Sequence, residues 1–386
     1  MPGGVYGAAP RGLQPTGSIG FSPVAPGAAS RPEELRDVGG GIAVLHKRLP
    51  AAFAKGSIPA AHLGTIGFAP VKRAMIVLPV LVAALASGCG DGGGGGGQRM
   101  TLALDFTPNA VHAPIYAAVR KGYDRDHGVR LRIRPPGSAP DALKLLAAGR
   151  ADVAVLDIHD LGLARERGRD FVGLGALVQR PLAAIIARPE VRRPRGLEGR
   201  RVGVSGLPSD AAVLRAVMED DGGDAGHAHV VTIGFSAVPS LIDRRVDAVP
   251  AFWNAEGVVL RRRGVPTREF RVDDYGAPLY PEVVLFTTRR ILERRRRRVK
   301  AVLVAVRDGV REVLAHPDPA VRDIARAGNS DEGLVRAQLR AVAPALRPPL
   351  VLRRRAIEGW AEWDARFGIL KRKPDVDRAF DFSLVR

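Results

Sequence analysis

The feature that most constrains this chain is an alternation of short apolar strands with helices, which begins at Thr101. The stretch TLALDFTPNAVHAPIYAAVRKGY (residues 101–123) opens with Leu102 and Leu104 in a strand pattern and passes through Thr-Pro-Asn into a helix. Ligands of open α/β sheets bind beyond the carboxyl ends of the strands. The polar residues that follow this first strand are therefore candidates for a small-molecule pocket.

The alternation continues along the chain and predicts an α/β fold with parallel strands. Two strands in tandem around Gln179-Arg180-Pro181 instead indicate a chain passing from one lobe to another. We predict strands at 129–133, 151–156, 171–178, 182–187, 201–205, 230–233, 248–252, 267–272 (an edge strand) and 283–288, helices at 140–149, 161–167, 211–219, 238–244 and 257–263, and a largely helical 289–366.

The first hundred residues differ from the rest in composition. Residues 1–70 are rich in Gly, Pro and Ala, and we expect them to be disordered or a mis-called extension. Residues 71–88 have the charge and the short apolar run of a signal peptide. The run ends in Ala-Ser-Gly-Cys, which resembles a bacterial lipobox, and a glycine-rich tether (89–98) follows. The resemblance implies acylation of Cys89, and a buried or incidental cysteine is the alternative. Because this signal begins near residue 71, we expect translation to start at or near Val71.

The charge of the chain is strongly positive, with 59 Lys+Arg against 40 Asp+Glu. The arginines are scattered, only five tyrosines are present, and no basic segment is interleaved with aromatic residues, so nucleic-acid binding is not expected. The run 294–298 could meet anionic lipid or a permease, although a solvated helix face is the simpler interpretation. His227 and His229 lie in a Gly-Asp loop without a cysteine partner, so we predict no metal site.

Several segments, taken in order, resemble one family: LDFTPNAVHAPIYAAVRKGY, AAGRADVAVLDIHDLGLARERG, ALVQRPLAAIIA, LEGRRVGVSG, LIDRRVDAVPAFWNAE and YPEVVLFTTRRIL. They are similar to type II periplasmic solute-binding proteins of ABC importers, in the branch that binds thiamine pyrimidine precursors and is related to the fungal pyrimidine synthase. The resemblance covers roughly residues 101–343. It implies a two-lobed α/β fold with a ligand cleft between lobe 1 (99–182 and 289–386) and lobe 2 (183–288).

The resemblance also implies an extracytoplasmic, lipid-anchored monomer that hands a ligand to a membrane permease and needs no cofactor. A pyrimidine ring calls for an aromatic face and a few fixed polar groups. We select candidates near the carboxyl ends of the predicted strands and at the crossovers between lobes: Asp105, Asn109, His112, Tyr116, Asp157 and Gln179 from lobe 1, and Ser205, Trp253, Asn254, Glu256 and Tyr280 from lobe 2.

Several of these candidates have a structural alternative. Trp253 is placed to stack on a ring, with Glu256 accepting from an exocyclic amine, and a core tryptophan is the alternative. Asn109 could cap the following helix, and His112 could be a packing residue. Asp157 and Asp160 could cap the predicted helix 161–167. Ser205 could offer its hydroxyl and backbone N–H groups to an anionic or carbonyl group.

The fungal relative is an enzyme, which makes synthesis the main rival to binding. It holds pyridoxal phosphate on a lysine and consumes a histidine, and these positions align with Leu156 and Asp160 here. His159 is adjacent, but the lysine is missing, and no cysteine cluster lies near 280–286. We therefore predict a binding protein without catalytic residues, with riboflavin or an alkanesulfonate such as taurine as alternative ligands.

Overall fold

A computed structural model describes residues 97–136 and 141–385, and all of them fall within one compact unit. The predictions on Cys89, the signal peptide, the extension and most of the tether lie outside these residues. In the part of the chain that the structure describes, no helix is long and apolar enough to cross a membrane.

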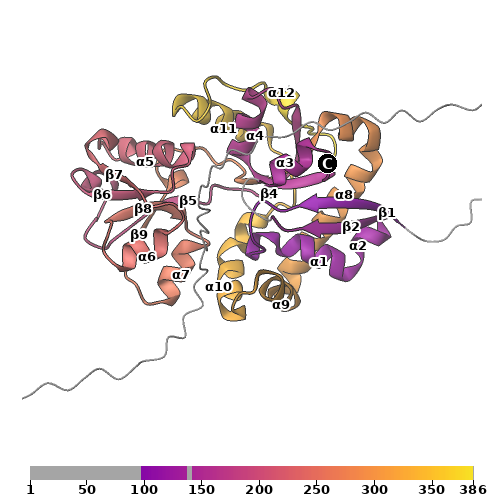
Figure 1. Cartoon of the computed structure of the whole chain (residues 1–386), viewed down its shortest axis with the longest axis horizontal. Helices are drawn as coiled ribbons and strands as arrows, with labels where there is room; N and C mark the ends of the chain where they lie inside the picture. The colour runs from indigo at the N-terminus through magenta and orange to yellow at the C-terminus, as the bar shows by residue number, and fades with distance from the viewer. Residues whose placement is uncertain (1–96, 137–140, 386) are drawn as a thin grey trace, which may run out of the picture. The chain divides into compact units, whose positions relative to one another are not determined.

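The first sheet has the order β2-β1-β3-β10-β4 and forms the centre of lobe 1 (Figure 1). All neighbours are parallel except β10, which runs antiparallel to β3 and β4. Because β10 pairs within this sheet, the predicted boundary of lobe 2 at residue 288 was wrong, and the return to lobe 1 comes before β10. Long helix α8 packs against α1 beside this sheet. The strands are β1 (Gln98–Ala103), β2 (Val129–Arg134), β3 (Val153–Asp157), β4 (Phe171–Val178) and β10 (Val283–Thr288).

The helices of lobe 1 come from both ends of the chain, and α9 and α10 pack near α1 and the turn that precedes it. They are α1 (Ala113–Lys121), α2 (Tyr123–Asp126), α3 (Asp141–Ala147), α4 (Ile158–Glu166), α8 (Arg289–Ala315), α9 (Pro317–Gly328), α10 (Glu332–Val342), α11 (Arg354–Arg366) and α12 (Val376–Ala379).

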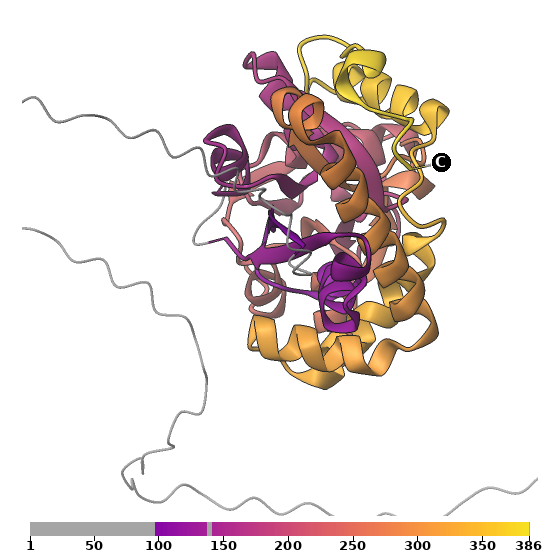
Figure 2. The same cartoon turned by 90° about the vertical axis from the view of Figure 1, so that its right-hand side faces the viewer.

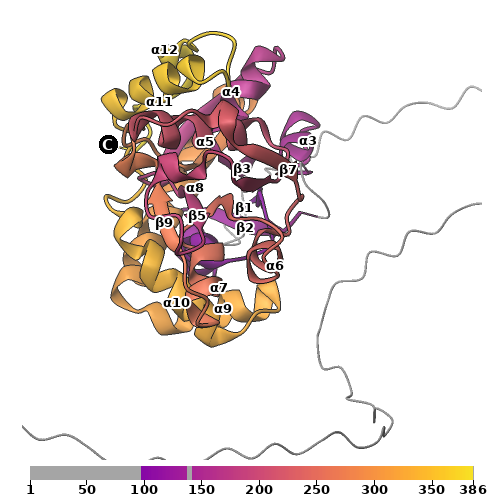
Figure 3. The same ribbon diagram turned by 90° about the vertical axis from the view of Figure 1, so that its left-hand side faces the viewer.

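The second sheet has the order β7-β6-β8-β5-β9 and belongs to lobe 2 (Figure 3). The strand β9 lies at its edge, as the sequence predicts. The elements are β5 (Ala183–Ala187), β6 (Arg201–Val204), α5 (Pro208–Asp220), β7 (His229–Thr232), α6 (Ala237–Ile242), β8 (Ala248–Phe252), α7 (Glu256–Arg262) and β9 (Arg268–Arg271).

The connections between the sheets fix which strand ends face each other. β4 ends at Val178 and β5 begins at Ala183, so the carboxyl end of β4 and the amino end of β5 lie at the junction between lobes. β1 and β3 run in the direction of β4, whereas β6, β7 and β8 run against β5. The carboxyl ends of the parallel strands of both sheets therefore point toward the junction. We call this side of each lobe the ligand edge.

Most predicted strands match the observed ones to within one or two residues. The helix α5 begins earlier than predicted, because Pro208 occupies its first turn, where proline is favoured. The sequence offers Ser209 or Asp210 as an N-cap for a helix beginning at residue 211, but the observed N-cap is Leu207. Gly149, predicted to end the helix before β3, has a left-handed φ of 67°.

Candidate functional site

The segment after β1 forms the first part of the ligand edge. Asn109 caps the turn of residues 110–112, because its Oδ1 accepts from the N–H of Val111 at 3.0 Å. Nδ1 of His112 accepts from the N–H of Asn109, and its Nε2 lies 2.7 Å from Oδ1 of Asp105. The capping alternative for Asn109 and the packing alternative for His112 are thus both realised in the structure.

This geometry assigns the tautomer of His112. A backbone N–H can only donate, so Nδ1 is the acceptor and the proton of the neutral ring is on Nε2, which donates to Asp105. Burial opposes ionisation of Asp105, but His112 and backbone N–H groups outweigh it and lower the pKa of Asp105. A carboxylate that is 27% exposed is thereby held at the ligand edge.

The end of β3 supplies a second carboxylate. Asp157 is the N-cap of α4, with Oδ1 accepting from the N–H of His159 at 2.8 Å. Burial raises the pKa of Asp160 to about 7, and the charges of Asp157 and Asp105 add to this effect. The cap alternative is correct for Asp157 but wrong for Asp160, which lies inside the first turn of α4 because this helix begins at Ile158 and not at residue 161.

A buried network lies behind these caps. Nδ1 of His159 is 2.8 Å from Asp364 of α11, and its Nε2 is 3.3 Å from the hydroxyl of Tyr280. Burial alone would lower the pKa of His159, but the charges of Asp364, Asp157 and Glu282 outweigh it and raise the pKa to about 10. His159 is therefore an imidazolium at neutral pH. Tyr280 is fully buried, so in this structure it packs against His159 and is not exposed at the ligand edge.

Glu282 connects both crossover segments to this network. Its Oε2 accepts from the N–H of Leu182 on the first crossover, while Glu282 itself lies on the second. Burial and the neighbouring Asp157 raise its pKa well above the ordinary range. Ligand atoms of Asp157, His159 and Glu282 lie within 4.8 Å of one another, a spacing a metal could use. Oxygens of Asp157 and Glu282 already accept backbone N–H groups, and His159 supplies the balancing positive charge.

The first crossover is held in place from two sides. The side-chain amide of Gln179 donates to carbonyl oxygens of Pro348 and Val351 and of its own strand. Arg180 pairs with the buried carboxylate of Asp273 at 2.6 Å. Gln179 therefore anchors the crossover to the C-terminal part of lobe 1, and its contact with a ligand stays a prediction.

Trp253 does not present an open ring face in this structure. It is only 3% exposed, its Nε1 donates to the carbonyl of Pro181, and the guanidinium of Arg271 lies 4.3 Å from the ring centroid. This corresponds to the core-tryptophan alternative. Adjacent side chains of a strand point to opposite faces. Trp253 is therefore buried, whereas Phe252, one residue earlier at the end of β8, points to the other face.

Asn254 and Glu256 follow Trp253 at the start of α7. Asn254 is 4% exposed, and its Oδ1 has no hydrogen-bond partner among the described residues. Glu256 accepts from the N–H of Phe252 at 3.0 Å, and burial raises the pKa of Glu256 above its ordinary value. Glu256 is half-buried and lies at the ligand edge, directly after β8.

The turn after β6 is already occupied by a carboxylate of the chain itself. Oδ2 of Asp210 accepts from the N–H groups of Ser205, Gly206 and Leu207, and from the hydroxyl of Ser205 at 2.7 Å. The N–H groups of this turn are therefore not free for a bound anion in this structure.

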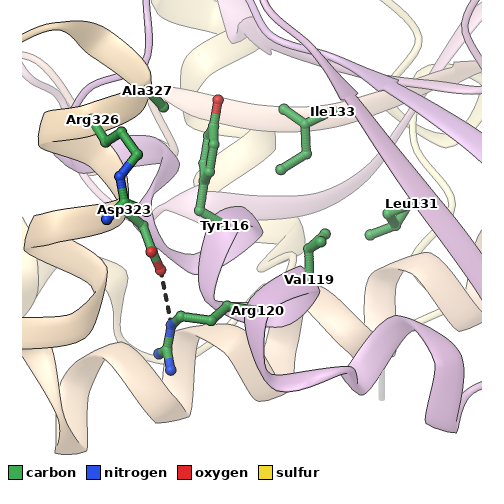
Figure 4. Close-up of a pocket in the computed structure, with 8 residues that line it drawn as sticks. All are labelled: Tyr116, Val119, Arg120, Leu131, Ile133, Asp323, Arg326 and Ala327. Carbon is green, nitrogen blue, oxygen red and sulfur yellow. Dashed lines mark hydrogen bonds and ion pairs between the residues drawn. The ribbon is translucent and has the colours of Figure 1, made fainter.

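Tyr116 lies apart from these polar contacts, in a groove of about 380 Å³ (Figure 4). Arg120 forms one end of the groove, paired with Asp323 at 2.8 Å. Burial raises the pKa of Tyr116 above its ordinary value. Other lining residues come from β2 and α9: Leu131, Ile133, Arg326 and Ala327.

Three aromatic rings that the sequence interpretation omitted are exposed near strand carboxyl ends at the ligand edge. Phe106 follows β1 in lobe 1 and is 55% exposed, Phe252 ends β8 in lobe 2 and is 40% exposed, and Phe235 follows β7 in lobe 2 and is 77% exposed. Phe106 and Phe252 stand directly at strand ends that point toward the junction, the criterion by which Asp105 and Trp253 were selected. The same criterion, applied one residue further along or back, would have found them.

Comparisons with known proteins agree with this architecture. Residues 109–320 match the protein family described as NMT1/THI5 like. The chain is 30% identical to the formylaminopyrimidine-binding protein of Halalkalibacterium halodurans over 58% of this chain and 69% of that protein. It is 22% identical to a 4-amino-5-hydroxymethyl-2-methylpyrimidine phosphate synthase of Saccharomyces cerevisiae, over 58% of this chain and 70% of the synthase.

Among solved structures, the periplasmic aliphatic sulphonate binding protein of Escherichia coli superposes with a TM-score of 0.61 at 13% identity, covering 73% of this chain and 97% of that one. At such low identity the likeness concerns the fold alone. It confirms the predicted two-lobed periplasmic binding protein fold.

Proposed function

Because the chain belongs to the NMT1/THI5 like family, we propose that it is the extracytoplasmic substrate-binding protein of an ABC importer and captures a thiamine pyrimidine precursor. A formylaminopyrimidine or a hydroxymethylpyrimidine-like compound is the expected ligand. The relative that carries the name formylaminopyrimidine-binding protein supports this choice.

The observation that carries the proposal is the pair of exposed rings, Phe106 and Phe252, one on each lobe at the ligand edge. A flat heterocycle between them would gain stacking from both lobes and would favour closure. Carboxylates flank both rings: Asp105 precedes Phe106, and Glu256 follows Phe252. Such groups suit the exocyclic amine of a pyrimidine. The proposed ligand contacts are therefore Phe106, Asp105, Asp157, Phe252 and Glu256.

The alternative functions have weaker support. Leu156, at the position aligned with the lysine of the synthase, is a buried aliphatic side chain and cannot form a Schiff base. His159 is held between Asp364 and Tyr280. For a sulfonate, the turn after β6 would be the natural site, but Asp210 occupies its N–H groups.

Lipid anchoring through Cys89 is part of the proposal and rests on the sequence between residues 71 and 98. Metabolic labelling with a radioactive fatty acid tests it, with Cys89→Ser as the control. Label on the Cys89→Ser chain, or none on the wild type in a bacterial host with lipoprotein processing, contradicts acylation. Peptides from residues 1–70 in the cellular protein would contradict a start near residue 71.

Titration calorimetry with formylaminopyrimidine, riboflavin and taurine tests the ligand. We expect heat with the pyrimidine, and Phe106→Ala and Phe252→Ala should each raise Kd about tenfold, since stacking contributes about 1–3 kcal/mol per ring. Val230→Ala, which truncates an exposed apolar residue on the edge strand β7, is the control and should leave Kd unchanged. Binding of taurine or riboflavin without any pyrimidine binding contradicts the proposal.

A further inference from the structure

The end of lobe 1 opposite the ligand edge carries many exposed arginines. β1, β3 and β4 begin there, and α8 starts there after the antiparallel β10. Figure 2 looks onto this end, with α8 running across it beside the start of β1. We call it the amino pole. Its exposed arginines are Arg99, Arg125, Arg150, Arg169, Arg290, Arg294 and Arg297.

The carboxylates at the amino pole are mostly taken by other arginines. Arg289 pairs with Asp170 at 2.9 Å, Arg295 with Asp152, and Arg296 with Asp381. Within the part of the chain that the structure describes, the seven exposed arginines of the amino pole given in the preceding paragraph have no carboxylate within ion-pair distance. The amino pole therefore keeps a net positive charge that ion pairs within the fold do not neutralise.

A uniform bias toward arginine does not explain this distribution. At the ligand edge of the same lobe, Asp105 and Asp157 lie at or next to the carboxyl ends of β1 and β3, Asp160 lies in the first turn of α4, and the buried Glu282 precedes the antiparallel β10. Exposed arginines thus collect at one end of the strands, whereas the carboxyl groups of Asp105 and Asp157 lie at the other. A charged surface distant from the ligand edge fits a large, oppositely charged partner.

We propose that the amino pole is a docking surface for an anionic lipid bilayer. The proposal rests on the proposed lipid-anchored function, because only an anchored chain stays near a bilayer. β1 begins at Gln98, so the segment from Cys89 to Gly97 lets the pole stand at most about 30 Å from the anchor. A short tether gives the pole a high effective concentration at the membrane, where contact within a Debye length of about 8 Å suffices.

This orientation has a functional consequence. With the amino pole on the bilayer, the acidic ligand edge points away from the anionic headgroups and is open to ligand from solution. If the chain docks on the permease through its ligand edge, the amino pole must leave the bilayer, so the two contacts would compete. Each arginine near an anionic surface strengthens binding about fivefold, so a few of them hold the pole only weakly and reversibly.

Vesicle co-sedimentation of the purified full chain bearing Cys89→Ser tests the proposal without an acyl anchor. The vesicles contain either phosphatidylcholine alone or phosphatidylcholine with about one third phosphatidylglycerol. Binding is measured at physiological ionic strength and again at high salt. The pole variant is Arg294→Glu/Arg297→Glu. The matched control, Arg192→Glu/Arg263→Glu, changes the charge equally at exposed arginines of lobe 2. Melting temperature and pyrimidine titration check that each variant folds.

We expect preferential binding to the anionic vesicles that high salt abolishes, a loss of at least twentyfold in the pole variant, and less than a threefold loss in the control. Equal losses in both variants, no preference for anionic lipid, or binding to a DNA duplex but not to vesicles would overturn the proposal. The two proposals fail separately: a chain that binds vesicles through the pole but gives no pyrimidine heat contradicts only the proposed ligand.

Discussion

Replacing Asp364 by Asn removes the partner of His159 at the centre of the buried network. Both side chains are inaccessible or nearly so, at 0% and 7% exposed, and the ion pair is 2.8 Å long. The variant keeps the shape of the side chain but leaves the imidazole without its main counter-charge. We expect Asp364→Asn to destabilise the folded chain strongly.

The magnitude follows from the pKa of His159. Its rise from the ordinary 6.5 to about 10 corresponds to about 5 kcal/mol of preference for the imidazolium in the folded state. Only part of this is lost in the variant, because Asp157 and Glu282 still attract the ring. Burial also raises the pKa of Asp364, so ionising that carboxyl offsets some of the gain. We therefore expect a loss of about 3 kcal/mol, at the low end for a broken buried pair.

Urea denaturation at several pH values is the assay. Because the folded-state pKa of His159 is raised, its stabilising contribution is complete below about pH 6.5 and disappears as the pH rises through about 10. The wild type should thus lose stability steadily across this window, whereas Asp364→Asn should show a flatter dependence. The control is Asp377→Asn, which alters an exposed pair with Arg354 and should cost less than about 1 kcal/mol.

Two results would refute this reasoning. One is an Asp364→Asn variant that loses no more stability than Asp377→Asn at pH 6.5. The other is a wild-type free energy of unfolding that stays flat between pH 6.5 and 10, which would mean that His159 is neutral in the folded chain. Titration of the His159 ring by NMR in the wild type separates these cases.

Two further changes test the packing. Gly309→Ala in α8 should cost several kcal/mol in urea denaturation, because a Cβ there would lie 2.0 Å from the carbonyl oxygen of Pro114; Gly196→Ala, with its nearest contact at 3.9 Å, is the control and should be nearly neutral. Asp210→Ala should cost about 2 kcal/mol, since it leaves Ser205 and the adjoining turn N–H groups without their acceptor, and a loss below about 0.5 kcal/mol would contradict the capping role.

The sequence predicts the strands well because apolar runs bounded by turns are local signals. It also locates the ligand edge, since the order of strands and crossovers fixes which ends face the junction. It fails at single side chains. Trp253 and Phe252 differ by one position, and only the observed end of β8 decides which ring is buried.

Contacts between distant segments account for the other omissions. His159 and Asp364 are separated by 205 residues, and nothing in the pattern of α11 marks Asp364 as a partner, because it occupies a helix that is otherwise amphipathic. Glu282 sits in an apolar run that continues into β10 and has no local polar neighbour. Its bond to Leu182 depends on two crossovers that meet only in the folded chain.

The distribution of strong and weak contacts bears on how the lobes could move. Buried groups hold the crossovers: Glu282 binds Leu182, and Arg180 pairs with a carboxylate that is 0% exposed. A contact between the lobes farther from the crossovers is the exposed pair of Arg262 and Asp331 at 3.3 Å, whose side chains are 46% and 68% exposed. An exposed ion pair contributes less than about 1 kcal/mol, whereas breaking a buried one costs about 3–5 kcal/mol. Separation of the lobes would therefore break the exposed ion pair distant from the crossovers and leave the His159 network intact. The two crossovers would then act as the hinge about which the lobes open at the ligand edge.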